Sequence, residues 1–385
     1  MLKQNQIHNF NAGPSALTPD IRAKISTAIE SIDGGPGILE LSHRSKTFDQ
    51  IIEQAKQHIE CLYELPSTHE VLFLQGGASL QFAMLPYNLG TRGGFVTTGE
   101  WSRRAFAEAC LLQTNEAQAP LEIHSEEAQG FCAVPKKVQI DLAINKHHDS
   151  DSVSKLDYLH VTSNNTIFGT QYNELPILVN QADEAQINPG FVIDASSDLF
   201  SKKVDWSKVD LLYGGAQKNA GPAGVTIVIG RRSILRSVPQ HPFCPKILAY
   251  QTHAEKGSLY HTPNTLGIYA VGAVAEWLCL EGGLDMIAER SHTRAQKIYD
   301  IIDHYSLYEG HAQKDSRSLM NLTFRTTIPE AEQDLLVQAQ ELNIYGLKGH
   351  RSVGGLRASL YNAVADESID ILADLLTKTA QKFGA

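Results

Sequence analysis

Apolar residues recur every three or four positions in two stretches near the start of the chain, which is the spacing of one face of an α-helix. The first stretch contains Ile21, Ile25, Ile29 and Ile32. Thr18 and Pro19 precede it as a helix cap and a first helical residue, and the Gly/Pro-rich residues 34–37 end it. The second stretch contains Phe48, Ile51, Ile52, Ala55, Ile59 and Leu62. The sequence therefore predicts two amphipathic helices in this region.

Short and almost wholly apolar segments follow, which are typical of strands buried on both faces of a sheet. They cover residues 71–74, 95–98, 158–161, 191–193, 209–212 and 225–229. A glycine-rich turn at 76–79 leads from the first of them into a predicted helix, and residues 102–112 form another. This pattern predicts an α/β fold with a mostly parallel sheet between layers of helices.

The remaining segments suggest a division of the chain into domains. Residues 113–155 are polar and irregular, and 145–155 have the composition of an exposed insertion. From about residue 285 the chain has helix, strand and helix signals of its own, ending in an amphipathic stretch at 368–377. We therefore predict a large domain at 16–285 and a smaller α+β domain at 286–385, joined by an N-terminal segment at 1–15.

Composition narrows the possible functions. The chain has 385 residues, with 33 basic and 43 acidic side chains and a formal charge of −10. No excess of Lys and Arg is present to neutralise a phosphate backbone, so a nucleic-acid partner is not expected. The hydrophobic content of 42% is ordinary for globular proteins and argues against disorder. A small local basic pocket remains compatible with these numbers.

The cysteine spacing and the hydropathy of the chain indicate the cellular compartment and whether a metal is bound. The five cysteines are scattered and form no CxxC pair, which fits a reducing compartment better than a disulfide framework. Zinc-ligand spacings, HExxH and the Walker A pattern are absent from the sequence, so no metal is expected. The most apolar helical segment, at 269–280, is short and contains Glu276. We therefore expect a cytoplasmic protein that does not enter the membrane.

The segment at 214–224 carries the most specific chemical signal. Lys218 lies there between two apolar strands and is surrounded by Gly and Ala residues. The alternative to function is a solvated loop lysine. However, small neighbours let a bulky ligand approach the backbone, and desolvation lowers the pKa of an amine so that it can act as a nucleophile. Lys218 is therefore a Schiff-base candidate.

A pyridoxal 5'-phosphate (PLP) site needs three further features. A carboxylate must hold the ring nitrogen protonated, and Asp194 at the end of a strand could do so, although it could also be a strand-end cap. The phosphate needs backbone donors at a helix N-terminus, which Ala78 and Ser79 could supply. Trp101 could stack on the ring, or it could be a core residue.

Taken together, these residues resemble the phosphoserine aminotransferases, a group of class V aminotransferases among the fold-type I PLP enzymes. The resemblance runs nearly from end to end. Its strings are FNAGP at 10–14, SHRSKTF at 42–48, LQGGASLQF at 74–82, SNNTIFG at 163–169, GAQKNAGPAGVTIVI at 215–229 and KGHRSVGGLRASLYNA at 348–363. The last two strings are the most specific to this family.

The resemblance implies a role for each cofactor-binding residue. Lys218 would form the Schiff base and shuttle the proton, and Asp194 would pair with the pyridinium nitrogen. Thr166 would bind the ring hydroxyl, and Trp101 would stack on the ring. The phosphate would be bound by Ala78, Ser79 and Gln217, and by His261 and Thr262 from a neighbouring subunit. The family has Asn where this chain has His261, and imidazole can still donate a hydrogen bond.

The resemblance also implies a set of substrate-binding residues. Arg357 would clamp the α-carboxylate, because a guanidinium group can make two parallel charge-assisted hydrogen bonds to it. The distal anion would be bound by His350 and Arg351, and by His43 and Arg44 from the partner subunit. Any single Arg could instead be a surface ion pair, but two His-Arg dipeptides are harder to explain in that way.

The expected activity is a ping-pong transfer of the amino group between glutamate and 3-phosphohydroxypyruvate, giving O-phosphoserine and 2-oxoglutarate. Such an enzyme serves serine biosynthesis and could also act on 4-phosphohydroxythreonine in pyridoxine biosynthesis. The expected assembly is a homodimer with its active sites at the interface. Two alternatives remain: an alanine–glyoxylate or serine–pyruvate type aminotransferase, and a non-catalytic PLP-binding protein.

Overall fold

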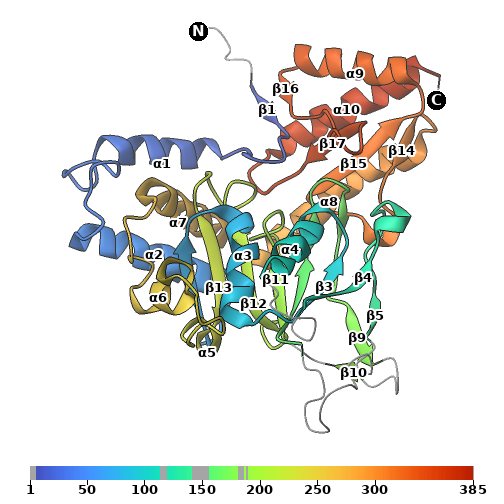
Figure 1. Cartoon of the computed structure of the whole chain (residues 1–385). Helices are drawn as coiled ribbons and strands as arrows, with labels where there is room; N and C mark the ends of the chain where they lie inside the picture. Colours follow the sequence, from blue (N-terminus) through green and yellow to red (C-terminus); the bar gives the residue numbers. More distant parts are fainter. Residues whose placement is uncertain (1–5, 113–118, 141–155, 181–185, 188–189, 385) are drawn as a thin grey trace.

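The computed structural model describes residues 6–112, 119–140, 156–180, 186–187 and 190–384 (Figure 1). The insertion predicted at 145–155 lies outside the described residues. The fold is the expected α/β arrangement, with a large central sheet between helices.

A seven-stranded sheet forms the centre of the molecule. Its order is β2 (His69–Leu74), β13 (Thr226–Arg231), β12 (Val209–Gly215), β11 (Phe191–Asp194), β6 (Tyr158–Thr162), β3 (Gly93–Thr97) and β4 (Leu121–Ser125). β13 is antiparallel to both of its neighbours, and the other pairs are parallel. The six strands predicted from apolar runs are all confirmed. β4 was not predicted, because its residues are mostly half-buried and polar ones interrupt the apolar pattern.

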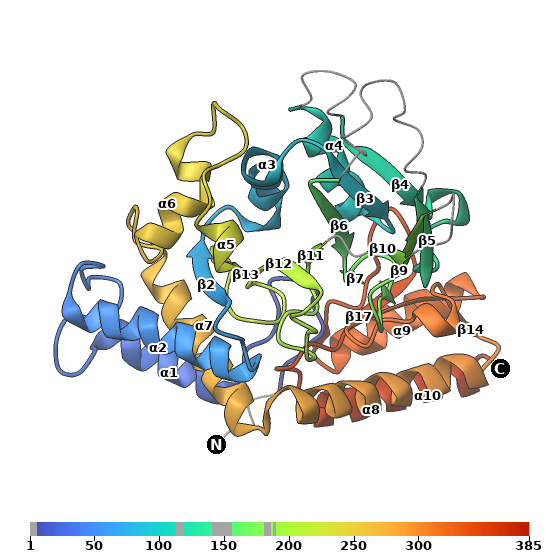
Figure 2. The same cartoon turned by 90° about the horizontal axis from the view of Figure 1, so that it is seen from below.

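Helices cover both faces of this sheet (Figure 2). On one face lie α1 (Pro19–Glu30), α2 (Lys46–Leu62) and α7 (Thr265–Leu280), and on the other lie α3 (Gly77–Leu89) and α4 (Glu100–Cys110). Thr18 caps α1 as predicted, its hydroxyl accepting a hydrogen bond from the Ile21 amide at 3.3 Å. The apolar stretch predicted for α1 extends too far along the chain. The helix ends at Glu30, before Ile32, and Ile29 is 39% exposed.

The C-terminal part of the chain builds a second hydrophobic core. Its elements are α8 (Gly283–His304), β14 (Tyr308–Gly310), β15 (Asn321–Thr326), α9 (Pro329–Glu341), β16 (Ile344–Tyr345), β17 (Leu356–Ser359) and α10 (Asp366–Lys382). β14, β15 and β17 form an antiparallel sheet, and β1 (His8–Asn9) pairs with β16. Phe10 therefore belongs to this second core.

α8 connects the two cores. Leu284 and Ile287 in its first turns pack into the core around the central sheet, whereas Ala295 and Ile298 pack into the C-terminal core. The predicted domain boundary after residue 285 falls in the first turn of this helix. The division at that residue stays a prediction.

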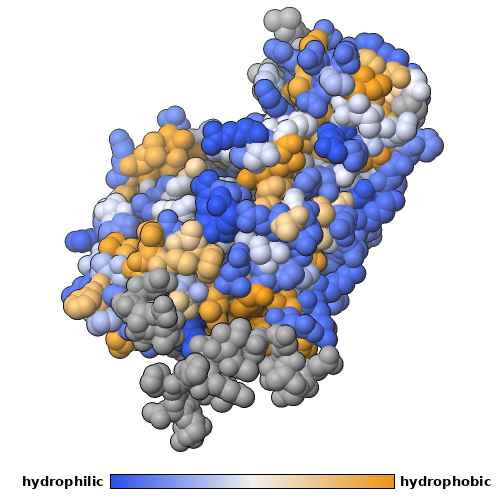
Figure 3. All heavy atoms as spheres, turned by 45° about the vertical axis from the view of Figure 1, so that its right-hand side comes forward, coloured by the Kyte–Doolittle hydropathy of each residue, from blue (hydrophilic) through white to orange (hydrophobic). Residues whose placement is uncertain are grey.

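The other described elements are short. They are η2 (Glu127–Gln129), β5 (Lys137–Ile140), β7 (Asn164–Asn165), β8 (Thr170–Gln171), β9 (Ile177–Asn180), β10 (Gln186–Ile187), α5 (Arg232–Leu235), η4 (Lys246–Leu248), α6 (Tyr250–Glu255) and η5 (Lys314–Ser316). Across the described ranges, none of the helices is both long and apolar enough to cross a membrane. On the face drawn in Figure 3, hydrophobic residues lie in small groups, and hydrophilic residues dominate the right-hand edge.

Candidate active site

The site lies where parallel strands of the central sheet end. Asp194 is the last residue of β11, and Lys218 follows β12 in the loop that returns to β13. β11 and β12 are neighbouring parallel strands, with Asp194 opposite Tyr213. The carboxyl ends of such strands are where α/β proteins bind ligands. The fold thus brings the predicted carboxylate and the predicted amine to the same edge of the sheet.

The Lys218 side chain points into a polar and aromatic cluster. Its Nζ donates a hydrogen bond to Thr166 Oγ1 at 2.8 Å and lies 5.3 Å from the centre of the Trp101 ring. Burial lowers the pKa of Lys218 to about 8, although the negative charge of Asp194 opposes this shift. A substantial fraction of the amine is therefore uncharged and nucleophilic near neutral pH.

Asp194 is a buried carboxylate held by one neighbour. Its side chain is 3% exposed, and Oδ1 accepts hydrogen bonds from the Ser196 amide at 3.0 Å and the Ser196 hydroxyl at 2.7 Å. Burial raises the pKa of Asp194, while Lys218 and Ser196 oppose the rise. Among the described residues, Oδ2 has no hydrogen-bond donor, so this oxygen is available to a protonated nitrogen of a ligand.

The N-terminus of α3 faces open space. Gly76 precedes the helix with φ +89°, and no side chain caps it. A Cβ on Gly77 would meet no atom within 4 Å, and Ser79 in the first turn is exposed. In the described part of the chain, the amides of residues 77–79 have no hydrogen-bond acceptor. Uncapped amides at the positive end of a helix dipole form an anion site, which suits a phosphate group.

Trp101 and the N-terminal segment complete the surroundings of Lys218. The indole Nε1 of Trp101 is buried without a hydrogen-bond partner among the described residues. Gly13 packs against Lys218, since a Cβ there would lie 3.1 Å from Lys218 Cγ. The Ser15 amide donates to the Gln217 carbonyl at 3.0 Å. The FNAGP string therefore closes one side of the lysine loop.

These residues fit PLP as a ligand. The amine of Lys218 suits its aldehyde, the free Oδ2 of Asp194 suits its ring nitrogen, and the α3 amides suit its phosphate. The Gln217 side chain folds back over Gly215, where a Cβ would lie 2.4 Å from its Oε1. Within the described ranges no hydrogen bond joins this side chain to α3, so its predicted role toward the phosphate stays a prediction.

Arg357 lies near the lysine, and His350 and Arg351 lie near Arg357. Arg357 on β17 donates from Nη1 to the Thr166 carbonyl at 3.3 Å, and its buried Nε has no partner among the described residues. Burial lowers the pKa of Arg357. Burial also lowers the pKa of His350, and the positive charges of Arg357 and of the exposed Arg351 lower it further. The half-buried guanidinium without a carboxylate partner marks a site for an anion.

Four predicted residues lie apart from this cluster. Arg44 is exposed and His43 half-buried in the loop that joins α1 to α2, at the left of Figure 1, while β17 is at the upper right. Thr262 is exposed, and the ring of His261 packs edge-on to His253 at 6.0 Å. In the described ranges, no hydrogen bond or ion pair joins any of the four to Lys218 or Arg357. This separation is what a contribution to a neighbouring subunit requires.

Asp198 is a functional candidate that the sequence analysis missed. It is 4% exposed and accepts hydrogen bonds from the Ser163 hydroxyl and, at 3.1 Å, from Gln171 Nε2. Its negative charge also raises the pKa of Lys218. The sequence did contain an indication of this role, because Asp198 lies four residues after Asp194 in a run of small polar residues.

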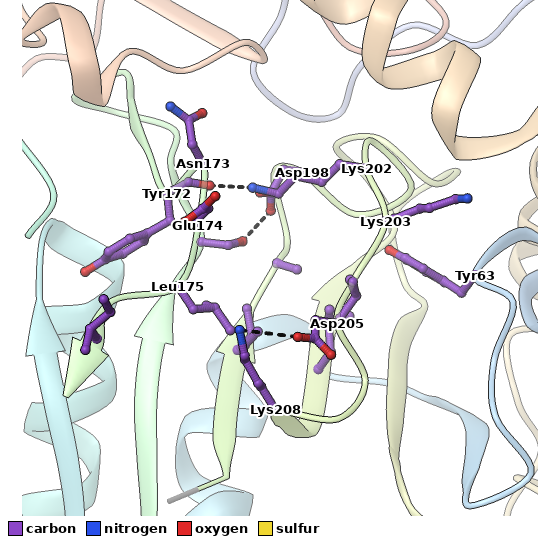
Figure 4. Close-up of a pocket in the computed structure, with 16 residues that line it drawn as sticks. Tyr63, Tyr172, Asn173, Glu174, Leu175, Asp198, Lys202, Lys203, Asp205 and Lys208 are labelled. Atoms are coloured by element: carbon purple, nitrogen blue, oxygen red, sulfur yellow. Dashed lines mark hydrogen bonds and ion pairs between the residues drawn. The ribbon is translucent and has the colours of Figure 1, made fainter. Parts of the chain in front are cut away.

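Asp198 also lines a cavity of about 510 Å³ on the α2 side of the sheet. Figure 4 shows Lys202 and Asp198 side by side at this cavity, and Lys202 Nζ is 3.8 Å from Asp198 Oδ2. Neither Lys218 nor Asp194 lines it. The cavity is therefore separate from the candidate active site, although Ser163 and Asp198 connect the two.

The lowered pKa of Lys218 predicts how the cofactor-free protein reacts with an aldehyde. Because the uncharged amine is the nucleophile, the rate of covalent capture of PLP should rise about tenfold per pH unit below pH 8 and level off above it. Stopped-flow absorbance of the cofactor measures this rate. An ordinary exposed lysine would give a rate that still rises at pH 10, and that profile would contradict the geometry described here.

Comparisons with known proteins agree with this arrangement. The profile of the family described as aminotransferase class-V matches residues 7–372. A phosphoserine aminotransferase of Lysinibacillus sphaericus is 42% identical over 380 residues, which are 97% of this chain and 98% of the relative. The structure of phosphoserine aminotransferase from Bacillus circulans subsp. alkalophilus has a TM-score of 0.85 at 37% identity, covering 98% of this chain and 99% of the other. A PLP-bound phosphoserine aminotransferase from Trichomonas vaginalis has a TM-score of 0.82 at 27% identity, covering 96% and 99%.

Proposed function

The chain belongs to the class-V aminotransferase family, and from this premise we propose that it acts as a phosphoserine aminotransferase. It transfers the amino group of glutamate to 3-phosphohydroxypyruvate and produces O-phosphoserine and 2-oxoglutarate. The observation that carries the proposal is that two side chains bind the same residue, Thr166. Lys218 Nζ donates to its hydroxyl, and Arg357, which has no carboxylate partner among the described residues, donates to its carbonyl. A carboxylate bound by Arg357 therefore lies beside the reactive amine.

The cofactor is PLP, which supplies an aldehyde for the substrate amine and an aromatic ring that accepts electrons from Cα. Lys218 would hold the aldehyde through Nζ, and its amine would move the proton at the substrate Cα. Asp194 would hold the proton on the ring nitrogen through Oδ2. Trp101 would cover the ring, and the amides of Ala78 and Ser79 would bind the phosphate at the N-terminus of α3.

The basic residues decide which substrates react. Arg357 binds the α-carboxylate that all four reactants share. His350 and Arg351 lie close enough to Arg357 for its charge to lower the pKa of His350, so they form one positive region with it. We assign them to the distal anion, which is a phosphate in one substrate pair and the γ-carboxylate in the other. One adjustable anion site serves both because the two half-reactions use it in turn.

An alanine–glyoxylate or serine–pyruvate aminotransferase is the alternative enzyme. Its substrates have no large distal anion, so the positive region around His350 and Arg351 would have no ligand. A non-catalytic PLP-binding protein is the alternative of another class. The nucleophilic Lys218 and the free Oδ2 of Asp194 favour turnover over simple retention of the cofactor.

An amine-transfer assay decides between these functions. The purified enzyme is given glutamate with 3-phosphohydroxypyruvate, pyruvate or glyoxylate, and 2-oxoglutarate is measured. We expect kcat/KM for the phosphorylated acceptor to exceed the others by at least about 10²-fold, as expected when a charged substrate group pairs in a desolvated site. Equal rates with pyruvate would support the alanine–glyoxylate type, and no transfer would support a binding protein. 4-Phosphohydroxythreonine is tested in the reverse direction, as an amino donor to 2-oxoglutarate, with glutamate as the measured product.

We further propose a homodimer in which each active site uses residues of both subunits. The support is the position of His43, Arg44, His261 and Thr262 in loops away from Lys218 of the same chain. We place the enzyme in the cytoplasm, where it serves serine biosynthesis and, through 4-phosphohydroxythreonine, pyridoxine biosynthesis. All five cysteines have free thiols, which supports a reducing compartment.

Subunit mixing tests the shared site. Arg44→Ala and Lys218→Ala homodimers should each be almost inactive, whereas a mixture that exchanges subunits should recover about a quarter of the wild-type activity. Half of the dimers in an equal mixture are then hybrids, and each hybrid has one intact site. Subunit exchange is verified with differently tagged chains. Verified hybrids without activity would place each site within a single chain.

A further inference from the structure

Two of the cysteines lie at the ends of neighbouring helices. Cys61 is the next-to-last residue of α2, and Cys279 is the next-to-last residue of α7. The two helices pack against each other: Gly272 of α7 lies against Ala55 of α2, and seven residues further along α7 the Cys279 thiol points at the His58 carbonyl. The contact nearer the C-terminus of α7, at Cys279, is also the one nearer the C-terminus of α2, at His58. The two helices therefore run in the same direction, and their C-terminal ends lie together.

Small residues bring the two backbones close. A Cβ on Gly272 would lie 2.9 Å from Ala55 Cβ and 3.1 Å from Ala55 Cα. His58 Nδ1 is 3.3 Å from the Gly272 carbonyl oxygen, and Cys279 Sγ is 3.6 Å from the His58 carbonyl oxygen. Cys61 lies one helical turn beyond His58, on the same face of α2. Cys279 Sγ thus lies against the last turn of α2, which contains Cys61.

The two thiols differ in access. Cys61 is exposed, whereas Cys279 is half-buried. Burial, together with the neighbouring Cys61 thiol, raises the pKa of Cys279 to about 11. The Cys61 thiol is therefore near enough to influence the Cys279 thiol. Cys61 is the thiol that a reagent in solution reaches first, and Cys279 is positioned to react with the product.

We propose that Cys61 and Cys279 form a redox-active dithiol site that hydroperoxides oxidise to an intramolecular disulfide bond between α2 and α7. The Cys61 thiolate attacks one peroxide oxygen, the O–O bond breaks, and one water leaves after protonation. The resulting sulfenic acid is attacked by Cys279 sulfur, its S–O bond breaks, and a second water leaves. Two thiols and one hydrogen peroxide thus give one disulfide and two waters, with two electrons passing from sulfur to oxygen.

The bond would connect two helices that matter for the proposed function. The loop before α2 carries His43 and Arg44, and the loop before α7 carries His261 and Thr262. A covalent link at the far ends of these helices limits how far they can shift relative to each other. This consequence rests on the proposed function, whereas the dithiol site itself does not.

Thiol mapping of the full-length, cofactor-loaded protein tests the proposal. After treatment with a small excess of hydrogen peroxide and alkylation, peptide mass spectrometry should find Cys61 linked to Cys279, with two of the five thiols lost. Dithiothreitol should restore both thiols. The oxidised protein should melt about 2–4 °C above the reduced one, because the link constrains the unfolded chain. Cys61→Ser and Cys279→Ser should each abolish the link, and Cys244→Ser, the matched control, should keep it.

Several results would overturn the proposal. Five intact thiols in the wild-type protein after oxidation of a control dithiol under the same conditions would do so. A link between other cysteines, or a link between two chains, would do so as well. Mapping of the wild-type protein decides the question even if a serine variant does not fold. Because this measurement does not depend on turnover, its failure is separable from failure of the amine-transfer assay.

Discussion

Replacing Lys218 with alanine should reduce kcat of amine transfer by about 10⁴-fold, the upper end of what one positioned acid–base group contributes. The reason is that, in the proposed function, the same Nζ would both bind the cofactor aldehyde and move the substrate proton. Its position supports both roles, since it lies 2.8 Å from Thr166 Oγ1 and 5.3 Å from the Trp101 ring centre. Single-turnover absorbance measurements with glutamate follow the chemical step directly.

A small amine such as methylamine should restore part of the activity of Lys218→Ala, because it can enter the space of the missing side chain and carry the proton. Borohydride should attach the cofactor of the wild-type protein to the peptide that contains Lys218. Lys208→Ala is the matched control, since its side chain is 61% exposed and is paired with Asp205. A cofactor label on another lysine, or an active Lys218→Ala without added amine, would remove Lys218 from this role.

The central sheet could be predicted from sequence because its inner strands are buried on both faces. Every residue of β6 and β11 is buried, and such strands produce continuous apolar runs that few other structures produce. β4 at the edge of the sheet has no fully buried residue, so its pattern is weaker. The pattern of apolar residues thus predicts a strand more clearly when the fold buries more of its residues.

Lys218 could be singled out from the sequence because it lies in a run of Gly and Ala residues at 214–224. Its surroundings in the structure, which include Gly13, Trp101 and Thr166, come from distant parts of the chain. Asp198 was missed because its partners Ser163 and Gln171 come from distant parts of the chain. The roles proposed for His43 and Arg44 would require a second subunit, which no pattern within one chain can position.

Replacing Asp194 with asparagine should reduce kcat by about 10²–10⁴-fold, while Lys218 still binds the cofactor. Removing one member of a buried ion pair costs about 3–5 kcal/mol, and here that energy keeps the proton on the ring nitrogen. Asparagine has nearly the same shape and can keep the Ser196 hydrogen bonds to Oδ1. The change therefore removes the charge and leaves the geometry. Turnover and the absorbance spectrum of the bound cofactor measure the result.

Stability measurements separate this electrostatic role from a structural one. Burial raises the pKa of Asp194, which means that holding the ionised carboxylate costs folding energy at pH values above that pKa. Asp194→Asn without cofactor should therefore melt no lower than the wild-type protein at neutral pH, whereas the stabilisation gained on adding PLP should shrink. Asp205→Asn, at an exposed ion pair with Lys208, should change neither quantity. A lower melting temperature of the cofactor-free Asp194→Asn variant, with an undiminished gain from PLP, would instead make Asp194 a structural residue of the strand end.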